Sequence, residues 1–256
     1  MKSRSASKPS ALVSVATILG ALAVFAATEV REEFHQTYPL NKQGKVQLEN
    51  VNGNVRIVTW DREEIKVDAI KHARKQEHLD EVKIDVDAKA DRIHIKTKFP
   101  DSKSKRNKNN STSVDYTLAV PKQSRLDGVS TVNGGVEIEN VTGDVKASSV
   151  NGPVTAAGLA GAIELSTVNG SVKASIVELK KAASLTSVNG GVTIALPVEA
   201  NADVTAHTLN GGINSDFSLQ AKKHFPVGQN LDGKLGAGGP AIKMSSVNGG
   251  IHLDRN

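Results

Sequence analysis

Paired carboxylates are the first chemistry to look for in this chain, because two acids at a set distance can hydrolyse a glycosidic bond. Such sites need carboxyl groups roughly 5 to 9.5 Å apart. Glu137 and Glu164 occupy strand positions that we expect to face solvent, but they do not fall on consecutive repeats of the sequence. Lys146 lies one repeat before Glu164, which predicts an exposed ion pair of small energetic weight. A polysaccharide-acting enzyme is therefore disfavoured and is kept only as a minor alternative.

Other catalytic or metal-binding patterns are equally weak. His72 and His78 lie close together in a charged segment without a third ligand, so we interpret them as solvated histidines. Calcium-binding nonapeptide repeats need a recurring acid, and Asp144 does not recur. The sequence contains no Gly-x-Ser-x-Gly elbow and no phosphate-cradling loop. We predict a protein that is not an enzyme and that holds no metal or cofactor.

A basic cluster is the remaining candidate binding site. It lies in and just before a polar loop expected over residues 100–113. With only Phe99 available to stack on bases, it argues against nucleic acid as a partner. It could contact anionic polysaccharide or acidic lipid headgroups through screened attraction, or simply keep a solvated loop soluble. Its residues are Lys96, Lys98, Lys103, Lys105, Arg106 and Lys108.

A recurring Asn-Gly pair organises most of the chain. Four copies, at Asn133, Asn151, Asn169 and Asn189, follow one another at nearly even intervals. Counting from the Val before each Asn, further apolar residues follow at offsets of four and six, and the same template recurs halfway between without Asn. The step is thus about nine residues, and two steps make one unit. The pairs are Asn52-Gly53, Asn133-Gly134, Asn151-Gly152, Asn169-Gly170, Asn189-Gly190, Asn210-Gly211 and Asn248-Gly249.

Units this small cannot bury their own apolar face, so they must stack on one another. We predict an all-β fold, a parallel β-solenoid of nine-residue strand-turn steps preceded by an N-terminal β-hairpin region. Stacking would align the Asn side chains as a ladder, and Asn and Gly suit such turns because they tolerate positive φ. A meander of antiparallel hairpins is the alternative, although it does not explain the long period.

The rest of the chain divides around this array. We expect a β-rich region over residues 27–125, in which Val51-Asn52-Gly53 forms an isolated first unit, and the solenoid over residues 126–256. Residues 216–237 break the period and are expected to form an insertion packed on the side of the stack. The last step ends at Asn256 without a capping segment, so self-association through the solenoid ends is an open alternative.

Residues 1–26 have the order of a signal peptide. Lys2, Arg4 and Lys8 precede an apolar run that ends in small residues, and we expect cleavage after Ala26. An uncleaved N-terminal anchor is the alternative, although the run is slightly short for a membrane span. Cleavage would lower the basic residues from 32 to 29 against 27 acidic ones. The expected location is outside the cytoplasm, in the periplasm or at the cell surface.

Several of these segments resemble the bacterial DUF4097 proteins, a β-strand repeat family that carries an adhesin label. The resemblance rests on VNGNVRI at 51–57, VDYTLAVPK at 114–122 and the turns TVNGSV at 167–172 and SVNGGV at 187–192. It runs from Phe34 to Leu253, with departures at Gly238 and in the insertion. The resemblance implies a β-solenoid-like fold at the cell envelope, without an established activity or catalytic residues.

These expectations favour a non-catalytic envelope or cell-surface protein that acts as an adhesin-like or structural interaction module. Its partners would be envelope components, anionic polysaccharide or other surface proteins. A self-assembling envelope scaffold is the alternative.

Overall fold

The computed structural model describes residues 29–100, 112–223 and 227–256, so the expected signal peptide and most of the basic loop lie outside the described residues. Its one helix within these ranges is α1 (Gln76–Glu81). The strands are β1 (Val30–Pro39), β2 (Lys45–Glu49), β3 (Val55–Trp60), β4 (Glu64–Ala73), β5 (Lys83–Lys89), β6 (Arg92–Lys98), β7 (Ser113–Pro121), β8 (Arg125–Asn133), β9 (Val136–Glu139), β10 (Val145–Asn151), β11 (Val154–Leu159), β12 (Ile163–Asn169), β13 (Val172–Ile176), β14 (Ala183–Asn189), β15 (Val192–Leu196), β16 (Ala202–Asn210), β17 (Ile213–Ser215), β18 (Lys222–Lys223), β19 (Gln229–Leu235), β20 (Ala241–Asn248) and β21 (Ile251–Arg255).

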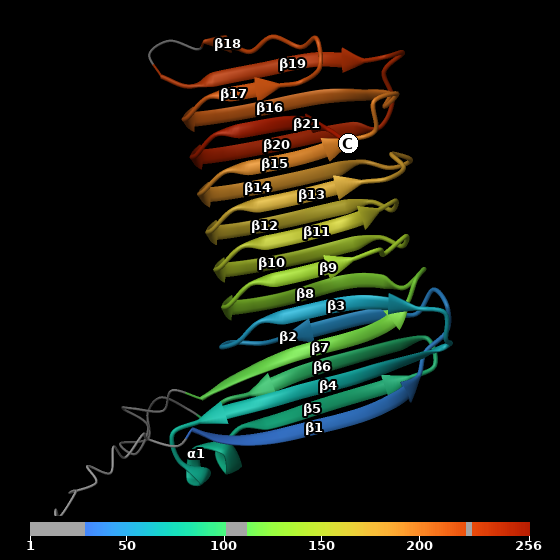
Figure 1. The fold of residues 1–256 in the computed structure, drawn as a ribbon, viewed down its shortest axis with the longest axis vertical. Helices are drawn as coiled ribbons and strands as arrows, with labels where there is room; N and C mark the ends of the chain where they lie inside the picture. Colours follow the sequence, from blue (N-terminus) through green and yellow to red (C-terminus); the bar gives the residue numbers. More distant parts are fainter. Residues whose placement is uncertain (1–28, 101–111, 224–226) are drawn as a thin grey trace, which may run out of the picture.

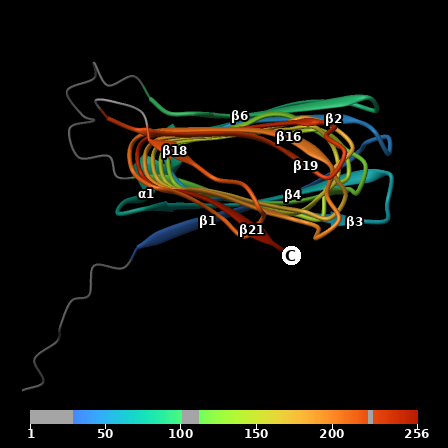
Figure 2. The same cartoon turned by 90° about the horizontal axis from the view of Figure 1, so that it is seen from above.

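Two long sheets face each other across a flattened core (Figures 1 and 2). Sheet A has ten strands in the order β1-β4-β7-β3-β9-β11-β13-β15-β21-β17, and sheet B has eleven in the order β18-β19-β16-β20-β14-β12-β10-β8-β2-β6-β5. Each turn of the coil, which we call a rung, contributes one strand to each sheet, and neighbouring rungs pair in parallel. The predicted parallel β-solenoid is confirmed, and the antiparallel meander is wrong for the repeats.

The core is built by residues that alternate along each strand. Val145 and Ala147 of β10 lie beside Ile163 and Leu165 of β12, and all four side chains are buried. On sheet A, Val154 stacks in the same way on Val172. Every rung therefore covers the apolar edges of the rungs above and below it, as the period of the sequence requires.

The N-terminal end of the stack is closed by antiparallel pairs. β1 pairs with β4 and β4 with β7 in sheet A, while β5 pairs with β6 in sheet B. The unit at Asn52 is not isolated as expected, because β2 lies beside β8 and β3 beside β9. It is a rung of the same stack, between β8 and β9 on one side and β6 and β7 on the other.

At the other end, two expectations are wrong, one about the position of the last strands and one about where the insertion packs. β20 lies between β14 and β16, and β21 lies between β15 and β17, so the last residues of the chain are inside the stack. The insertion after β17 packs over the end of the stack instead of its side, where β19 pairs antiparallel with β16. The expected bare end at Asn256 therefore does not exist.

The aliphatic residue before each Asn-Gly, a valine in all but Leu209, faces solvent, although the repeat pattern groups it with the apolar template. The inward position is the Ser or Thr just before it, such as Ser149 and Thr167, which are buried. Within the described ranges, no helix has the length and hydropathy to cross a membrane.

Glycine at the Asn-Gly turn is required by close backbone approach more than by positive φ. A Cβ on Gly152 would lie 2.1 Å from the carbonyl oxygen of Gly134 in the rung below. Asn140 is the one non-Gly residue with positive φ among those described, so the ladder asparagines do not use that conformation. The expectation that the ladder asparagines adopt positive φ is therefore wrong.

We predict that Gly152→Ala destabilises the protein by about 3 kcal/mol, because its Cβ must push two rungs apart. Gly212→Ala is the matched control, since a Cβ at that position would meet no other atom within 4 Å. The measurement is the urea midpoint followed by circular dichroism. Equal midpoints for the two variants would contradict the steric explanation.

Candidate functional site

An unbroken ladder of amides runs up one corner of the stack. Asn151 Nδ2 donates to Asn133 Oδ1 at 2.8 Å, and Asn169 Nδ2 donates to Asn151 Oδ1 at the same distance. The pattern continues in stack order, not chain order, so that Asn248 stands between Asn189 and Asn210. In that order the members are Asn52, Asn133, Asn151, Asn169, Asn189, Asn248 and Asn210.

Behind the ladder, a column of buried hydroxyls fixes the corner from inside. Ser149 Oγ donates to the carbonyl oxygen of Gly134 at 2.8 Å, and Thr167 Oγ1 donates to that of Gly152 at 2.8 Å. These bonds satisfy the glycine carbonyls at a point where backbone leaves the sheet. The hydroxyls are those of Thr131, Ser149, Thr167, Ser187, Ser246 and Thr208.

Next to the ladder, on the outer surface of sheet B, a line of aliphatic side chains is exposed to solvent. We call this line the aliphatic stripe. Its members are 36% to 40% exposed, one on each rung that has an Asn-Gly turn. They are Val51, Val132, Val150, Val168, Val188, Val247 and Leu209. Single exposed valines are ordinary, whereas a continuous exposed apolar line marks a surface for interaction.

A second outward column lies two positions before the stripe on each strand. Ser148 pairs in register with Ser130 on one side and Ser166 on the other, and Thr186 and Ser245 continue the column. The outer face of sheet B therefore repeats hydroxyl, aliphatic and amide groups on successive rungs, about 4.8 Å apart. None of the three columns carries a charge between β8 and β20.

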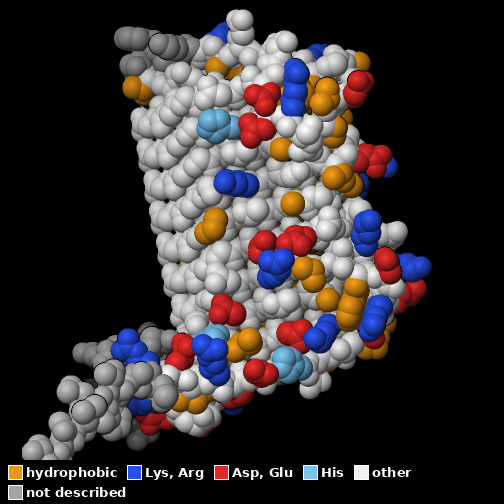
Figure 3. All heavy atoms as spheres, in the orientation of Figure 1, with side chains coloured by type: hydrophobic (Ala, Val, Ile, Leu, Met, Phe, Trp, Pro, Cys, Tyr) orange, Lys and Arg blue, Asp and Glu red, His pale blue; other side chains and the backbone are white. Residues whose placement is uncertain are grey.

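Figure 3 shows the opposite, sheet A, side of the same corner. There, charged side chains gather over the strands at the N-terminal end and toward the far corner. The edge formed by the Asn-Gly turns is free of charged side chains over most of its height. The uncharged character of the corner thus extends around both of its sides.

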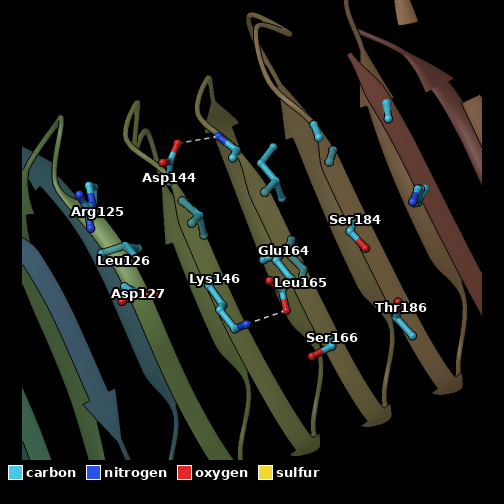
Figure 4. Close-up of a pocket in the computed structure, with 17 residues that line it drawn as sticks. Arg125, Leu126, Asp127, Asp144, Lys146, Glu164, Leu165, Ser166, Ser184 and Thr186 are labelled. Atoms are coloured by element: carbon cyan, nitrogen blue, oxygen red, sulfur yellow. Dashed lines mark hydrogen bonds and ion pairs between the residues drawn. The ribbon is translucent and has the colours of Figure 1, made fainter. Parts of the chain in front are cut away.

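An open groove of about 840 Å³ lies farther along the same face of sheet B, over the starts of β8, β10, β12 and β14 (Figure 4). Charged side chains line it together with small polar residues such as Ser184. Lys146 Nζ lies 2.9 Å from Glu164 Oε1, the ion pair predicted from their spacing. That contact raises the pKa of Lys146.

Asp144, a second of the three acids that line the groove, is also paired with a lysine. Lys181 Nζ donates to Asp144 Oδ1 at 2.8 Å, and the backbone N–H of Ala162 donates to the same oxygen at 2.9 Å. These bonds lower the pKa of Asp144, Lys181 having the larger effect. A general acid needs a carboxyl pKa raised toward neutral pH. The groove therefore has the charge arrangement of a binding surface more than of a glycosidase.

The two histidines do not form a common site, and they are not solvated as expected. His72 lies between Asp115 and Glu29, with Nε2–Oδ2 and Nδ1–Oε2 distances of 3.4 and 3.6 Å, while His78 lies on α1. Their side chains are only 17% and 12% exposed, because the two residues lie on β4 and α1 and not in an open loop. Among the residues described, no group of three metal-ligating side chains occurs.

The described part of the basic cluster is already paired. Lys96 Nζ lies 2.6 Å from Glu49 Oε2, and Lys98 pairs with Asp85. Lys103, Lys105, Arg106 and Lys108 lie outside the described residues. Contact of this cluster with an anionic partner stays a prediction.

Sequence reasoning missed the aliphatic stripe, although a signal for it was present. Val145, Ala147 and Ser149 have the same parity along β10, so a strand that buries Val145 must also bury Ser149 and expose Val150. Grouping residues by hydrophobicity instead of by parity hid this surface.

Comparison with known proteins supports the architecture. The family model described as Toastrack DUF4097 matches residues 123–254. A "putative cell adhesion protein" of Clostridium sporogenes has a similar structure, with a TM-score of 0.51 and 11% identity over 88% of this chain and 100% of its own. No curated protein matches the chain.

Two further solved structures align less well. A "putative adhesin" of Bacteroides fragilis gives a TM-score of 0.28 at 14% identity over 88% of this chain and 97% of its own. A "putative lipid binding protein" of Parabacteroides distasonis gives 0.29 at 11% identity over 86% and 96%. At such identities, the Clostridium structure is evidence for the fold alone.

We predict that Asn169→Ala lowers the free energy of unfolding by about 2 kcal/mol and Asn210→Ala by about 1 kcal/mol. Asn169 both donates to Asn151 and accepts from Asn189, whereas Asn210 has one ladder bond, to Asn248. Urea unfolding measures both losses. Equal losses would contradict the expectation that each ladder bond adds its own contribution to stability.

We also predict that the pKa of Asp144 lies below the usual value of about 3.9 and rises in Lys181→Gln. Because the folded-state pKa is lowered, the stability that this group contributes is present above the unfolded pKa and is lost as the pH falls through the folded pKa. A carbon-13 NMR titration of the carboxyl group measures the shift. Lys180→Gln is the control, since Lys180 pairs with Glu178; an unchanged midpoint in Lys181→Gln would contradict the assignment.

Proposed function

The chain belongs to the Toastrack DUF4097 family, and from this premise we propose that it is a non-catalytic interaction module of the cell envelope. It binds its partner on the outer face of sheet B, next to the Asn-Gly corner. The cell-adhesion name of the Clostridium structure agrees with such a role and belongs to that protein.

The observation that carries this proposal is the aliphatic stripe. Seven rungs at about 4.8 Å give it a length of about 29 Å. Binding to aliphatic groups on a rigid sheet does not require loops to become ordered, so it has a small entropic cost. Contact with a partner surface is favoured because it removes apolar area from water. The flanking Ser and Asn groups add hydrogen-bonding capacity at the same spacing.

The charge arrangement supports a binding role over a catalytic one. The acids that line the groove, Asp127, Asp144 and Glu164, form ion pairs with Lys45, Lys181 and Lys146. None of them stands alone in an apolar pocket, where a carboxyl group becomes a general acid.

The envelope location rests on residues 1–26, whose basic flank and apolar run have the order of an export signal. Export would place the aliphatic stripe among envelope polymers and surface proteins. Envelope proteins and polysaccharide are therefore the partner classes that we propose.

We predict that Val150→Thr combined with Val168→Thr weakens binding to an envelope fraction of the native host by roughly 10- to 30-fold, because two methyl contacts become hydroxyls that need water. Thr keeps the shape and strand preference of Val. Co-sedimentation of the purified protein with the fraction gives the affinity.

Val177→Thr is the control, because Val177 is 59% exposed but lies outside the stripe. Equal affinity of the double variant and the control would place the binding surface elsewhere. Absence of binding by the unchanged protein would overturn the proposed function itself.

A further inference from the structure

The order of rungs in the stack differs from their order in the chain. β14 and β15 are followed in sequence by β16 and β17, yet β20 and β21 lie between these two rungs. Both edges of the inserted rung are paired in parallel. Asn248 stands in register with Asn189 on one side and with Asn210 on the other.

The site that holds this rung, which we call the insertion slot, selects for the repeat template. Ile242 and Met244 fill the core between Ala183 and Leu185 of β14 and Val204 and Ala206 of β16. Ser246 donates to the carbonyl oxygen of Gly190, and Gly249 accepts from Thr208. Only a segment with this alternation and an Asn-Gly turn can satisfy both walls of the slot.

The end of the inserted segment is held by contacts on both sides. The backbone N–H of Asn256 donates to the carbonyl oxygen of Leu196, and Asn256 Nδ2 donates to that of Ile176 at 2.7 Å. On the other side, the guanidinium of Arg255 lies 5.0 Å from the ring centre of Phe217. The bound segment is thus fixed by its neighbours independently of the link that leads to it.

That link is residues 236–240, whose sequence is Gly-Ala-Gly-Gly-Pro. It starts at β19, which pairs with the far edge of β16, and must cross β16 to reach the slot. Gly236 and Gly238 both have positive φ, so the crossing uses conformations that favour glycine. A short, glycine-rich link joined to a separable element is the arrangement in which element exchange between copies occurs.

We propose that the insertion slot accepts residues 241–256 from a second copy of this chain, so that two molecules exchange their last rung. The contacts in the slot are the same whichever chain supplies the segment. Exchange is therefore governed by protein concentration and by release of the segment from its own slot, as during folding. The contacts that hold the segment are made by strand edges and core side chains, whereas Val247 of the segment belongs to the aliphatic stripe on the outer face. The proposal does not depend on the proposed function.

The absence of cysteine from the sequence allows a direct test. Ser184 of β14 and Lys243 of β20 are in register and face outward, within the reach of a disulfide. Ser184→Cys and Lys243→Cys are made in separate full-length chains, which are mixed, unfolded, refolded at high concentration and oxidised. A disulfide-linked heterodimer on a non-reducing gel is the expected result, at least 10-fold above the control pair.

The control pair is Lys173→Cys with Lys243→Cys, because Lys173 lies in sheet A beside Thr155 and Thr193. A single chain that carries both Ser184→Cys and Lys243→Cys should close its own disulfide when refolded at low concentration. If it closes while the mixed chains dimerise no more than the control, the exchange proposal is overturned.

Thr186→Cys with Ser245→Cys, another registered pair on the same strands, repeats the experiment should the first pair not oxidise. Failure of the exchange would leave binding through the stripe untouched, because the stripe variants contain no change in the slot.

Discussion

Backbone contact between successive Asn-Gly turns is the constraint on which the rest of the structure depends. The carbonyl oxygen of Gly134 occupies the place that a Cβ on Gly152 would need, and Gly152 stands in the same relation to Gly170. This contact brings neighbouring rungs close enough for the Asn amides to bond at 2.8 Å and for Ser149 to reach a carbonyl one rung below. The spacing of the turns also sets the spacing of the strands that follow them, so the apolar side chains of neighbouring rungs pack against one another in the core.

The two corners of the coil consequently differ in how much variation in the length of the connecting segment they tolerate. At the Asn-Gly corner, every turn makes the same close approach between its glycine and the backbone of the neighbouring rung. The opposite corner connects β11 to β12 through residues 160–162 and β13 to β14 through residues 177–182, and the insertion after β17 leaves the coil there as well. Among the rungs that carry an Asn-Gly turn, variation in the length of the connections is therefore confined to the opposite edge, and the adjacent face of sheet B stays regular along those rungs.

The fold could be predicted from the sequence because its period is carried by side chains whose roles are local. The spacing of Val154 and Val172 in the sequence is enough to predict that they stack on neighbouring rungs. The spacing of Lys146 and Glu164 predicts their ion pair in the same way. The position of the last rung could not be predicted, because Asn248 fits beside Asn189 and beside Asn210 equally well. Repeats that are interchangeable in sequence leave the order of stacking undetermined, and only the length and path of residues 236–240 decide it. The candidate site shows the same limit, since Val150 is equivalent to a core residue by hydropathy and its exposure follows only from its strand neighbours Val145 and Ser149.

A surface made of equivalent rungs distributes binding energy over many small contacts. From β8 to β20 in the stack, each rung offers one aliphatic group, one hydroxyl and one amide, whereas Glu49 and His207 take the hydroxyl position in the rungs beyond them. Because the rungs from β8 to β20 are alike, none of them can act as a dominant anchor. Affinity on such a face grows with the number of rungs that a partner covers, and it favours extended partners over small molecules. Inserting the last rung within the stack instead of at its end lengthens this face without exposing a new sheet edge, because β19 still pairs with the outer edge of β16. The out-of-order topology is thus compatible with a long binding face and a protected end in one chain.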